Sequence, residues 1–165
     1  MTIDTAFHGD CTAAEEMKRM LLRVDEIHRA VTRAMGRMEY LKLAAERANS
    51  SLTPIRYGRG VERSRVEYAV LERDAERWGI NELRQELEKL LTIVEPLVRR
   101  LPAGLMRAVA TQRILEGVPC GLIAQRMHFT RAYVYRYLNK SYDTLCILYA
   151  GEIRKQEEGS NVHAL

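Results

Sequence analysis

The chain has 165 residues, with 26 Lys or Arg against 22 Asp or Glu, so its formal net charge is +4. Its 47% apolar content is enough for a packed core in one or two small domains. No apolar run approaches the roughly 18 residues of a membrane span, and residues 1–16 lack the basic start and apolar stretch of a secretory signal. We therefore expect a cytoplasmic protein.

The residues indicate neither a catalytic nor a metal site. Cys11, Cys120 and Cys146 are far apart and belong to no set of four Cys or His ligands at zinc spacing. The sequence also lacks a glycine-rich phosphate loop, a GxSxG motif and an HExxH motif. We expect no enzyme activity and no bound metal or other cofactor.

A long helix is the first predicted element. Residues 1–12 are polar and aperiodic, which predicts a disordered N-terminus. In the segment that follows, apolar residues recur alternately every three and four positions. They are Met17, Met20, Val24, Ile27, Val31, Ala34, Met38, Leu41, Ala45 and Ala48. This spacing predicts a helix of about 35 residues with one face committed to a partner helix.

A second long helix is predicted after a loop. Residues 49–60 collect Asn, Ser, Pro and Gly, which is typical of a loop. Ser64 and Glu67 then form a capping box, which predicts a helix start. Because two helices of similar length are joined by a loop, we expect residues 13–101 to form an antiparallel, coiled-coil-like helical hairpin.

The second helix carries the same alternating apolar spacing over residues 80–101. A kink or local break is expected at residues 78–81, and a bend at Pro96. An isolated two-helix hairpin buries little apolar surface. We therefore expect this oligomerisation arm to pack on the C-terminal domain or on a second copy, and we expect a homodimer.

Residues 102–150 predict a three-helix domain, and residues 151–165 a disordered tail. The first helix of the domain is expected from Gly104 to Glu116, with Gly117 at its end. Its apolar side chains are expected to cover the two helices that follow. They are Leu105, Val109, Ile114 and Leu115.

Residues 119–142 have the pattern of a helix-turn-helix. Ile123, Ala124 and Met127 give the short first helix an apolar stripe. Ala124 is small, as the close crossing of two helices requires. The spacing of these residues thus predicts a first helix packed tightly against a second.

His128 and Phe129 are predicted to form the turn, with Phe129 as the apolar side chain beneath it. Thr130 has the hydroxyl that caps the recognition helix, residues 130–142. The side chains that this helix is expected to bury are Val134, Tyr137 or Leu138, and Tyr133. Its opposite face is expected to expose Arg131, Ala132, Tyr135, Arg136 and Asn139.

The exposed face predicts an interface with double-stranded DNA. The expected contact residues are Arg126, Thr130, Arg131, Tyr135, Arg136, Asn139 and Lys140. Arg131 and Arg136 can each bond guanine bidentately, and Asn139 can bond adenine. Thr130 and Tyr135 are expected to contact phosphate or a thymine methyl group.

The charge distribution favours this interface. Six of the 26 basic and two of the 22 acidic residues lie between Gly104 and Asp143. This segment therefore carries +4, the whole net charge of the chain. Such concentration is typical of phosphate binding, although paired amphipathic helices also occur in proteins that never bind nucleic acid.

Residues 113–145 resemble the C-terminal part of phage-encoded transcriptional regulators of the ArpU and RinA late-gene type, whose helix-turn-helix resembles region 4 of sigma-70 factors. The matching positions are Arg113-Ile114-Leu115-Glu116-Gly117, Ile123-Ala124, Thr130, Val134-Tyr135-Arg136 and Leu145. The long helix, the Pro/Gly loop and the Ser64/Glu67 helix start resemble their N-terminal half. This resemblance implies a prophage-encoded transcriptional regulator that binds DNA.

Two positions depart from the family pattern. Ile114 replaces an aromatic residue, and His128 occupies a turn position that favours glycine. A residue at that position of the turn is expected to adopt the left-handed backbone conformation, which histidine tolerates less well than glycine.

Two other functions compete with transcriptional regulation. A phage DNA-packaging protein of the small-terminase type also combines a helix-turn-helix with long helices, but it usually has the DNA-binding element first. A minimal sigma-like factor would contact RNA polymerase, yet the first hundred residues hold few aromatic residues for promoter melting. A ring of eight or more subunits would favour packaging, and a monomer or dimer would favour regulation.

Overall fold

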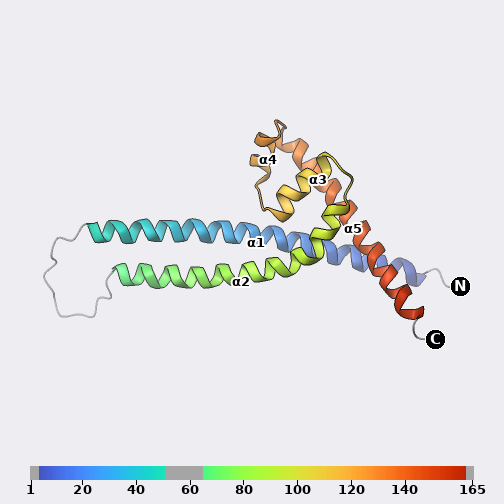
Figure 1. Ribbon diagram of the computed structural model, residues 1–165, viewed down its shortest axis with the longest axis horizontal. Helices are drawn as coiled ribbons and strands as arrows, with labels where there is room; N and C mark the ends of the chain where they lie inside the picture. The colour runs from blue at the N-terminus through green and yellow to red at the C-terminus, as the bar shows by residue number, and fades with distance from the viewer. Residues whose placement is uncertain (1–3, 51–64, 163–165) are drawn as a thin grey trace. The chain divides into compact units, whose positions relative to one another are not determined.

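The computed structural model describes residues 4–50 and 65–162 (Figure 1). Regular structure in these two ranges is helical, without a strand, so the expected all-α class is confirmed. None of the helices within these ranges is long and apolar enough to cross a membrane. The predicted loop at residues 49–60 and the capping side chain of Ser64 fall largely or wholly outside the described residues.

Two long helices come first, and shorter segments precede a third long helix. The elements are α1 (Asp4–Ser50), α2 (Arg65–Arg100), α3 (Leu105–Ala110), the π-helical turn η1 (Thr111–Leu115), α4 (Cys120–Arg126) and α5 (Arg131–Val162). Gly117 follows η1 with a φ of 69°, in the left-handed region that favours glycine. The predicted end of this helix at Gly117 is therefore confirmed.

Helical structure extends further at both ends than the sequence suggested. α1 already begins at Asp4, and α5 continues to Val162, although residues 1–12 and 151–165 were expected to be disordered. In the C-terminal extension of α5, Glu152 accepts a hydrogen bond from Arg100 of α2.

The sequence predicts a kink or a local break at residues 78–81. α2 is continuous through these residues, so the helix does not break there. Gly79 costs a helix interior about 1 kcal/mol relative to alanine, which is too little to end a long helix. Pro96 lies inside α2, near its C-terminal end.

The described residues form two compact units. Unit 1 combines the chain up to Glu26 with the chain from Glu88 onward, and unit 2 comprises Ile27–Leu87. The boundary predicted at residue 102 thus falls inside unit 1.

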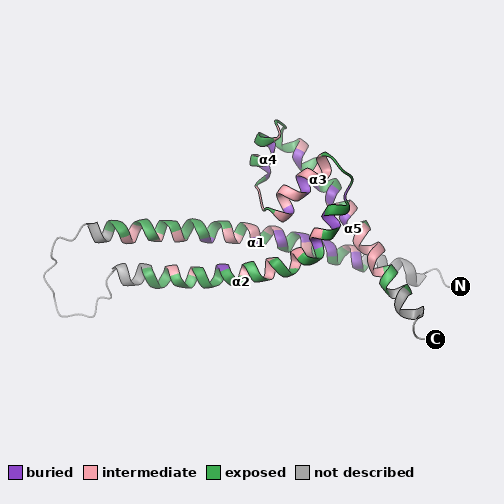
Figure 2. Cartoon of the chain, viewed as in Figure 1, coloured by how far each residue is buried: buried purple, intermediate pink, exposed green. Residues whose placement is uncertain are grey.

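The core of unit 1 draws on all of its helices (Figure 2). The contributions of the two long helices are Met17, Leu21 and Val24 from α1, and Val94, Leu97, Val98 and Leu101 from α2. The C-terminal helices add Val109, Ala110, Ile114, Cys120, Ile123, Ala124, Val134, Leu138, Leu145 and Cys146. α3 and α4 both pack against α5. Residues predicted for the hairpin and for the C-terminal domain therefore share one core.

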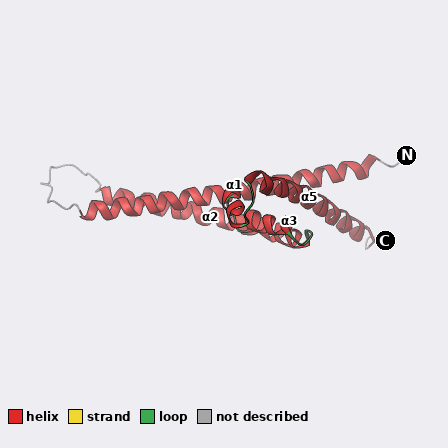
Figure 3. Cartoon of the chain, turned by 90° about the horizontal axis from the view of Figure 1, so that it is seen from above, coloured by secondary structure: helices red, strands yellow, loops and turns green. Residues whose placement is uncertain are grey.

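Unit 2 has a much sparser core. Its parts of α1 and α2 lie side by side (Figures 1 and 3). Among its side chains whose burial is described, the buried apolar ones are Ile27, Ala34 and Ile80. Arg37 donates two hydrogen bonds to the carboxylate of Glu76, at 2.6 and 3.0 Å. This bonding raises the pKa of Arg37 and lowers the pKa of Glu76. An exposed pair of this kind adds little stability.

Candidate nucleic-acid interface

α4 presents one apolar side to the core. Pro119 precedes it with φ −60° and ψ 139°, and its carbonyl oxygen accepts the amide hydrogen bonds of Leu122 and Ile123. Ile123 and Ala124 are buried, as the sequence predicts, and Met127 is half-buried. The predicted apolar stripe of this helix is confirmed.

The chain leaves α4 through a Schellman motif. The amide of Phe129 donates to the carbonyl of Ala124 at 2.9 Å, and the amide of His128 donates to that of Gln125 at 3.3 Å. His128 has a φ of 56° and is the one non-glycine residue in the described ranges with positive φ. The predicted left-handed conformation is therefore present, and it costs an L-residue about 1 kcal/mol.

α5 begins with the predicted cap. The hydroxyl oxygen of Thr130 accepts the amide hydrogen bond of Tyr133 at 3.2 Å. Val134 and Leu138 are buried on the inner side of α5, and Tyr133 and Tyr137 are half-buried. Local hydrogen bonds thus fix the end of α4, the turn and the start of α5.

Ser141 is a contact that the sequence did not indicate. It is fully buried, and its hydroxyl lies 2.8 Å from the carbonyl oxygen of Tyr137 and 3.3 Å from that of Met106 in α3. This small polar residue lets α3 approach α5 closely while its own hydroxyl stays hydrogen-bonded.

Phe129 does not fill the space beneath the turn, so that prediction is wrong. Its side chain is 39% exposed, and its ring lies 4.8 Å from the ring of Tyr133. Tyr133 in turn lies 4.9 Å from Tyr137, with the two hydroxyl oxygens 3.2 Å apart. The hydrogen bond with Tyr137 raises the pKa of Tyr133. The ring of Phe129 thus rests against Tyr133, with the two ring planes tilted by 35°.

All the residues expected to contact DNA are exposed. They are Arg126, Thr130, Arg131, Tyr135, Arg136, Asn139 and Lys140. Arg126 belongs to the end of α4, and the others belong to Thr130 and the first turns of α5. Lys140 also lies over the ring of Tyr137, with its ammonium nitrogen 5.6 Å from the ring centroid. The face is open to a ligand, and what binds it stays a prediction.

Arg131 differs from its neighbours in direction. Its guanidinium lies against Gly121 of α4, where a Cβ atom on residue 121 would stand 2.9 Å from Nη2 and 3.0 Å from Nε. Only a glycine leaves room for this contact without a shift of the arginine. Arg131 therefore extends toward α4, which the sequence alone did not indicate.

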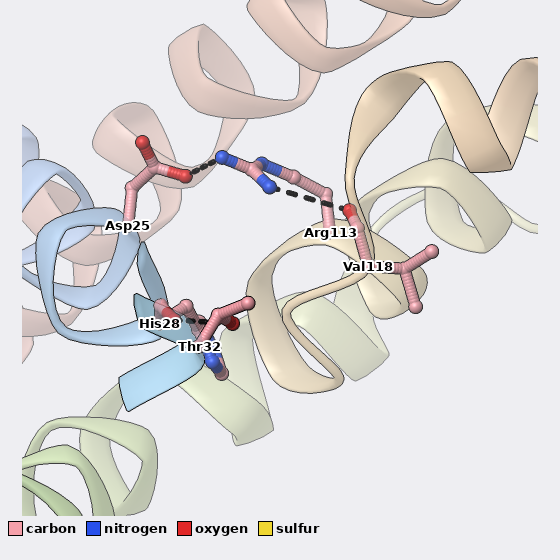
Figure 4. Close-up of polar contacts among 5 residues, drawn as sticks. All are labelled: Asp25, His28, Thr32, Arg113 and Val118. Carbon is pink, nitrogen blue, oxygen red and sulfur yellow. Dashed lines mark hydrogen bonds and ion pairs between the residues drawn. The ribbon is translucent and has the colours of Figure 1, made fainter. Parts of the chain in front are cut away.

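Two of the six basic residues between Gly104 and Asp143 are bonded inside the protein. Arg107 donates to the carbonyl of Leu101 at 2.8 Å. Arg113 pairs with Asp25 of α1 and donates to the carbonyl of Val118 at 3.3 Å (Figure 4). The predicted basic segment is thus reduced at its surface to Arg126, Arg131, Arg136 and Lys140, together with the exposed acidic residues Glu116 and Asp143.

Comparison with known proteins found no relative of this chain. No protein-family model matches the chain, and neither a curated protein nor a solved structure matches it. Within the described residues, no three His, Cys, Asp or Glu side chains gather in a way that could hold a metal ion.

Proposed function

We propose that this chain is a sequence-specific DNA-binding transcriptional regulator. In this proposal α4, the turn at His128 and the start of α5 form a helix-turn-helix, and the exposed face of α5 enters the major groove. The observation that carries the proposal is the division of α5. Val134 and Leu138 are buried on one side, while Arg136 and Asn139 are exposed on the other.

The exposed residues suit the two tasks of a DNA-binding helix. Arg136 and Asn139 have the bidentate groups that fit guanine and adenine edges. Arg126 and Lys140 supply positive charge on either side of these two residues in sequence, where phosphate contacts would fix the register on the duplex. This division of roles is what separates specific from non-specific binding.

We also propose that the protein acts as a homodimer through unit 2. No described side chain of residues 35–47 or 70–79 is buried, whereas several large apolar side chains there are exposed. They are Met35, Tyr40, Leu43, Val70, Leu71 and Trp78. A pair of helices with so little buried surface gains stability when another surface covers it.

Charge favours a second copy as that cover. Residues 27–50 of α1 hold five basic and two acidic residues, whereas residues 65–87 of α2 hold four basic and six acidic ones. The basic helix of one copy can therefore lie against the acidic helix of the other. Two such contacts are equivalent in a twofold dimer, which would carry two recognition helices, one from each copy.

Selection from a random pool of duplex DNA tests the DNA-binding proposal. The full chain should enrich one sequence, and fluorescence anisotropy should show tighter binding to that duplex than to a scrambled one. Arg136→Ala should weaken binding to the selected duplex by ~1–3 kcal/mol and relax the preference at one base pair.

Arg19→Ala is the matched control, because Arg19 is an exposed arginine of α1 outside both the proposed DNA interface and the proposed dimer contact. It should leave affinity and sequence preference unchanged. Equal weakening on all duplexes by Arg136→Ala would make Arg136 a phosphate contact. If no duplex is enriched or bound, the proposed function is wrong.

A further inference from the structure

The first two turns of α5 direct their exposed residues to different sides. Successive residues of an α-helix are rotated by about 100°, so Ala132 and Arg136 lie on one side, one turn apart. That side is opposite to Val134 and Leu138, which are buried. Ala132 itself is exposed, and it therefore lies at the centre of the outward surface of the first turn.

The side chain of Arg131 is directed away from this outward surface around Ala132. Its guanidinium lies over Gly121 of α4, close enough that an added Cβ atom would approach Nη2 to 2.9 Å. The planar group thus bridges the two helices across the turn. We assign Arg131 as a positioning residue, in contrast to the guanine contact that the sequence suggested.

The residues around Ala132 restrict which group in the DNA groove its side chain can contact. Arg136 and Tyr135, both exposed, stand one turn further along α5. An alanine is short, so the backbone of α5 can come close to the floor of the groove at this point. Its methyl group offers no hydrogen bond, and the apolar group that the major groove presents is the 5-methyl of thymine.

We propose that Ala132 is a specificity-determining residue that reads the 5-methyl group of a thymine. This inference rests on the proposed DNA-binding function and names the base that the first turn of α5 selects. Tyr135, one turn along, closes one side of the contact, and Arg136 reads the neighbouring base pair. The preferred sequence therefore contains a thymine beside the base pair that Arg136 contacts.

Deoxyuridine substitution tests the contact directly, because deoxyuridine differs from thymidine only by the missing 5-methyl group. Each thymidine of the selected duplex is replaced in turn, and the full chain is titrated by fluorescence anisotropy. One thymidine in each recognition element should lose about fourfold in affinity, the loss of one buried methyl group. This scan uses the unaltered protein, so it does not depend on the folding of a variant.

Ala132→Gly links the effect to this residue. The variant should bind the thymidine and deoxyuridine duplexes equally at that position. Ala103→Gly is the matched control, since Ala103 is also exposed and lies outside both the proposed DNA interface and the proposed dimer contact. It should retain the roughly fourfold preference.

The outcomes separate the two proposals. Specific binding without a deoxyuridine effect, or an effect that Ala132→Gly leaves unchanged, overturns the role of Ala132 and leaves the DNA-binding proposal standing. If no duplex is bound at all, both are overturned.

Discussion

Arg113 of η1 and Asp25 of α1 form an ion pair although 88 positions separate them in the sequence. Their side chains are only 13% and 19% exposed. Arg113 also donates to the carbonyl of Val118, in the segment that leads into α4 (Figure 4). The pair therefore connects α1 to the residues that position α4.

Removal of Asp25 should destabilise unit 1. Asp25→Ala leaves the guanidinium of Arg113 largely out of water without its counter-charge, which should cost roughly 2–3 kcal/mol. Urea unfolding followed by circular dichroism measures the change. Glu76→Ala serves as control, because its pair with Arg37 is more exposed and should matter less. Equal losses in the two variants would mean that the Asp25 pair is no stronger than a surface pair.

The turn at His128 should be improved by glycine. His128 holds a φ of 56°, so His128→Gly removes the steric cost of a left-handed L-residue and should raise the free energy of unfolding by about 1 kcal/mol. Gln125→Gly, placed three residues earlier inside α4, should lower it by a similar amount. Thermal unfolding compares the two variants. A destabilised His128→Gly would show that the histidine side chain contributes more than its backbone conformation costs.

These results show which features the sequence can specify. Thr130 and His128 were predicted because a cap and a Schellman turn depend on residues within five positions. The pair of Asp25 with Arg113 was missed, because it depends on how α1 packs within unit 1. The outward ring of Phe129 and the contact of Arg131 with Gly121 were missed for a related reason, since periodicity does not fix side-chain rotamers.

The predicted boundary at residue 102 should fail as a place to cut the chain. A fragment of residues 102–150 lacks the buried side chains of Met17, Leu21, Leu97 and Leu101 that belong to the core of unit 1. Loss of several large core residues exceeds the stability of a small domain. We expect the fragment to show low helicity and no cooperative melting by circular dichroism. A fragment that melts cooperatively with high helicity would show that the C-terminal helices need neither α1 nor α2.

Trp78 can report on the proposed dimer. It is the single tryptophan of the chain, and its side chain is 73% exposed in one copy. If a second copy covers this part of unit 2, its fluorescence should shift to shorter wavelength and become less accessible to acrylamide as concentration rises. Sedimentation should show a dimer over the same range. An oligomer in which Trp78 stays fully quenchable would place the interface elsewhere, and a monomer at all concentrations would refute the dimer.

The salt dependence of DNA binding should reflect the cations that remain at the surface. Arg107 and Arg113 are bonded inside the protein. Arg131 lies over Gly121, and Arg136 is assigned to a base edge. Arg126 and Lys140 are therefore left to meet phosphates. Each phosphate neutralised contributes a slope of about −0.9, so these two cations would give a slope of about −1.8 in a plot of log binding constant against log salt.

Lys140→Gln should make that slope shallower by about 0.9 and should cost at most about 1 kcal/mol of stability, from the lost contact with the Tyr137 ring. Arg19→Gln, outside both the proposed DNA interface and the proposed dimer contact, should leave the slope unaltered. A slope of about −5.4 would mean that all six basic residues of the segment reach phosphate, which requires Arg113 to leave Asp25 on binding. A slope near zero would exclude the groove-docking arrangement, since an interface that uses Arg126 and Lys140 on phosphates must release counterions.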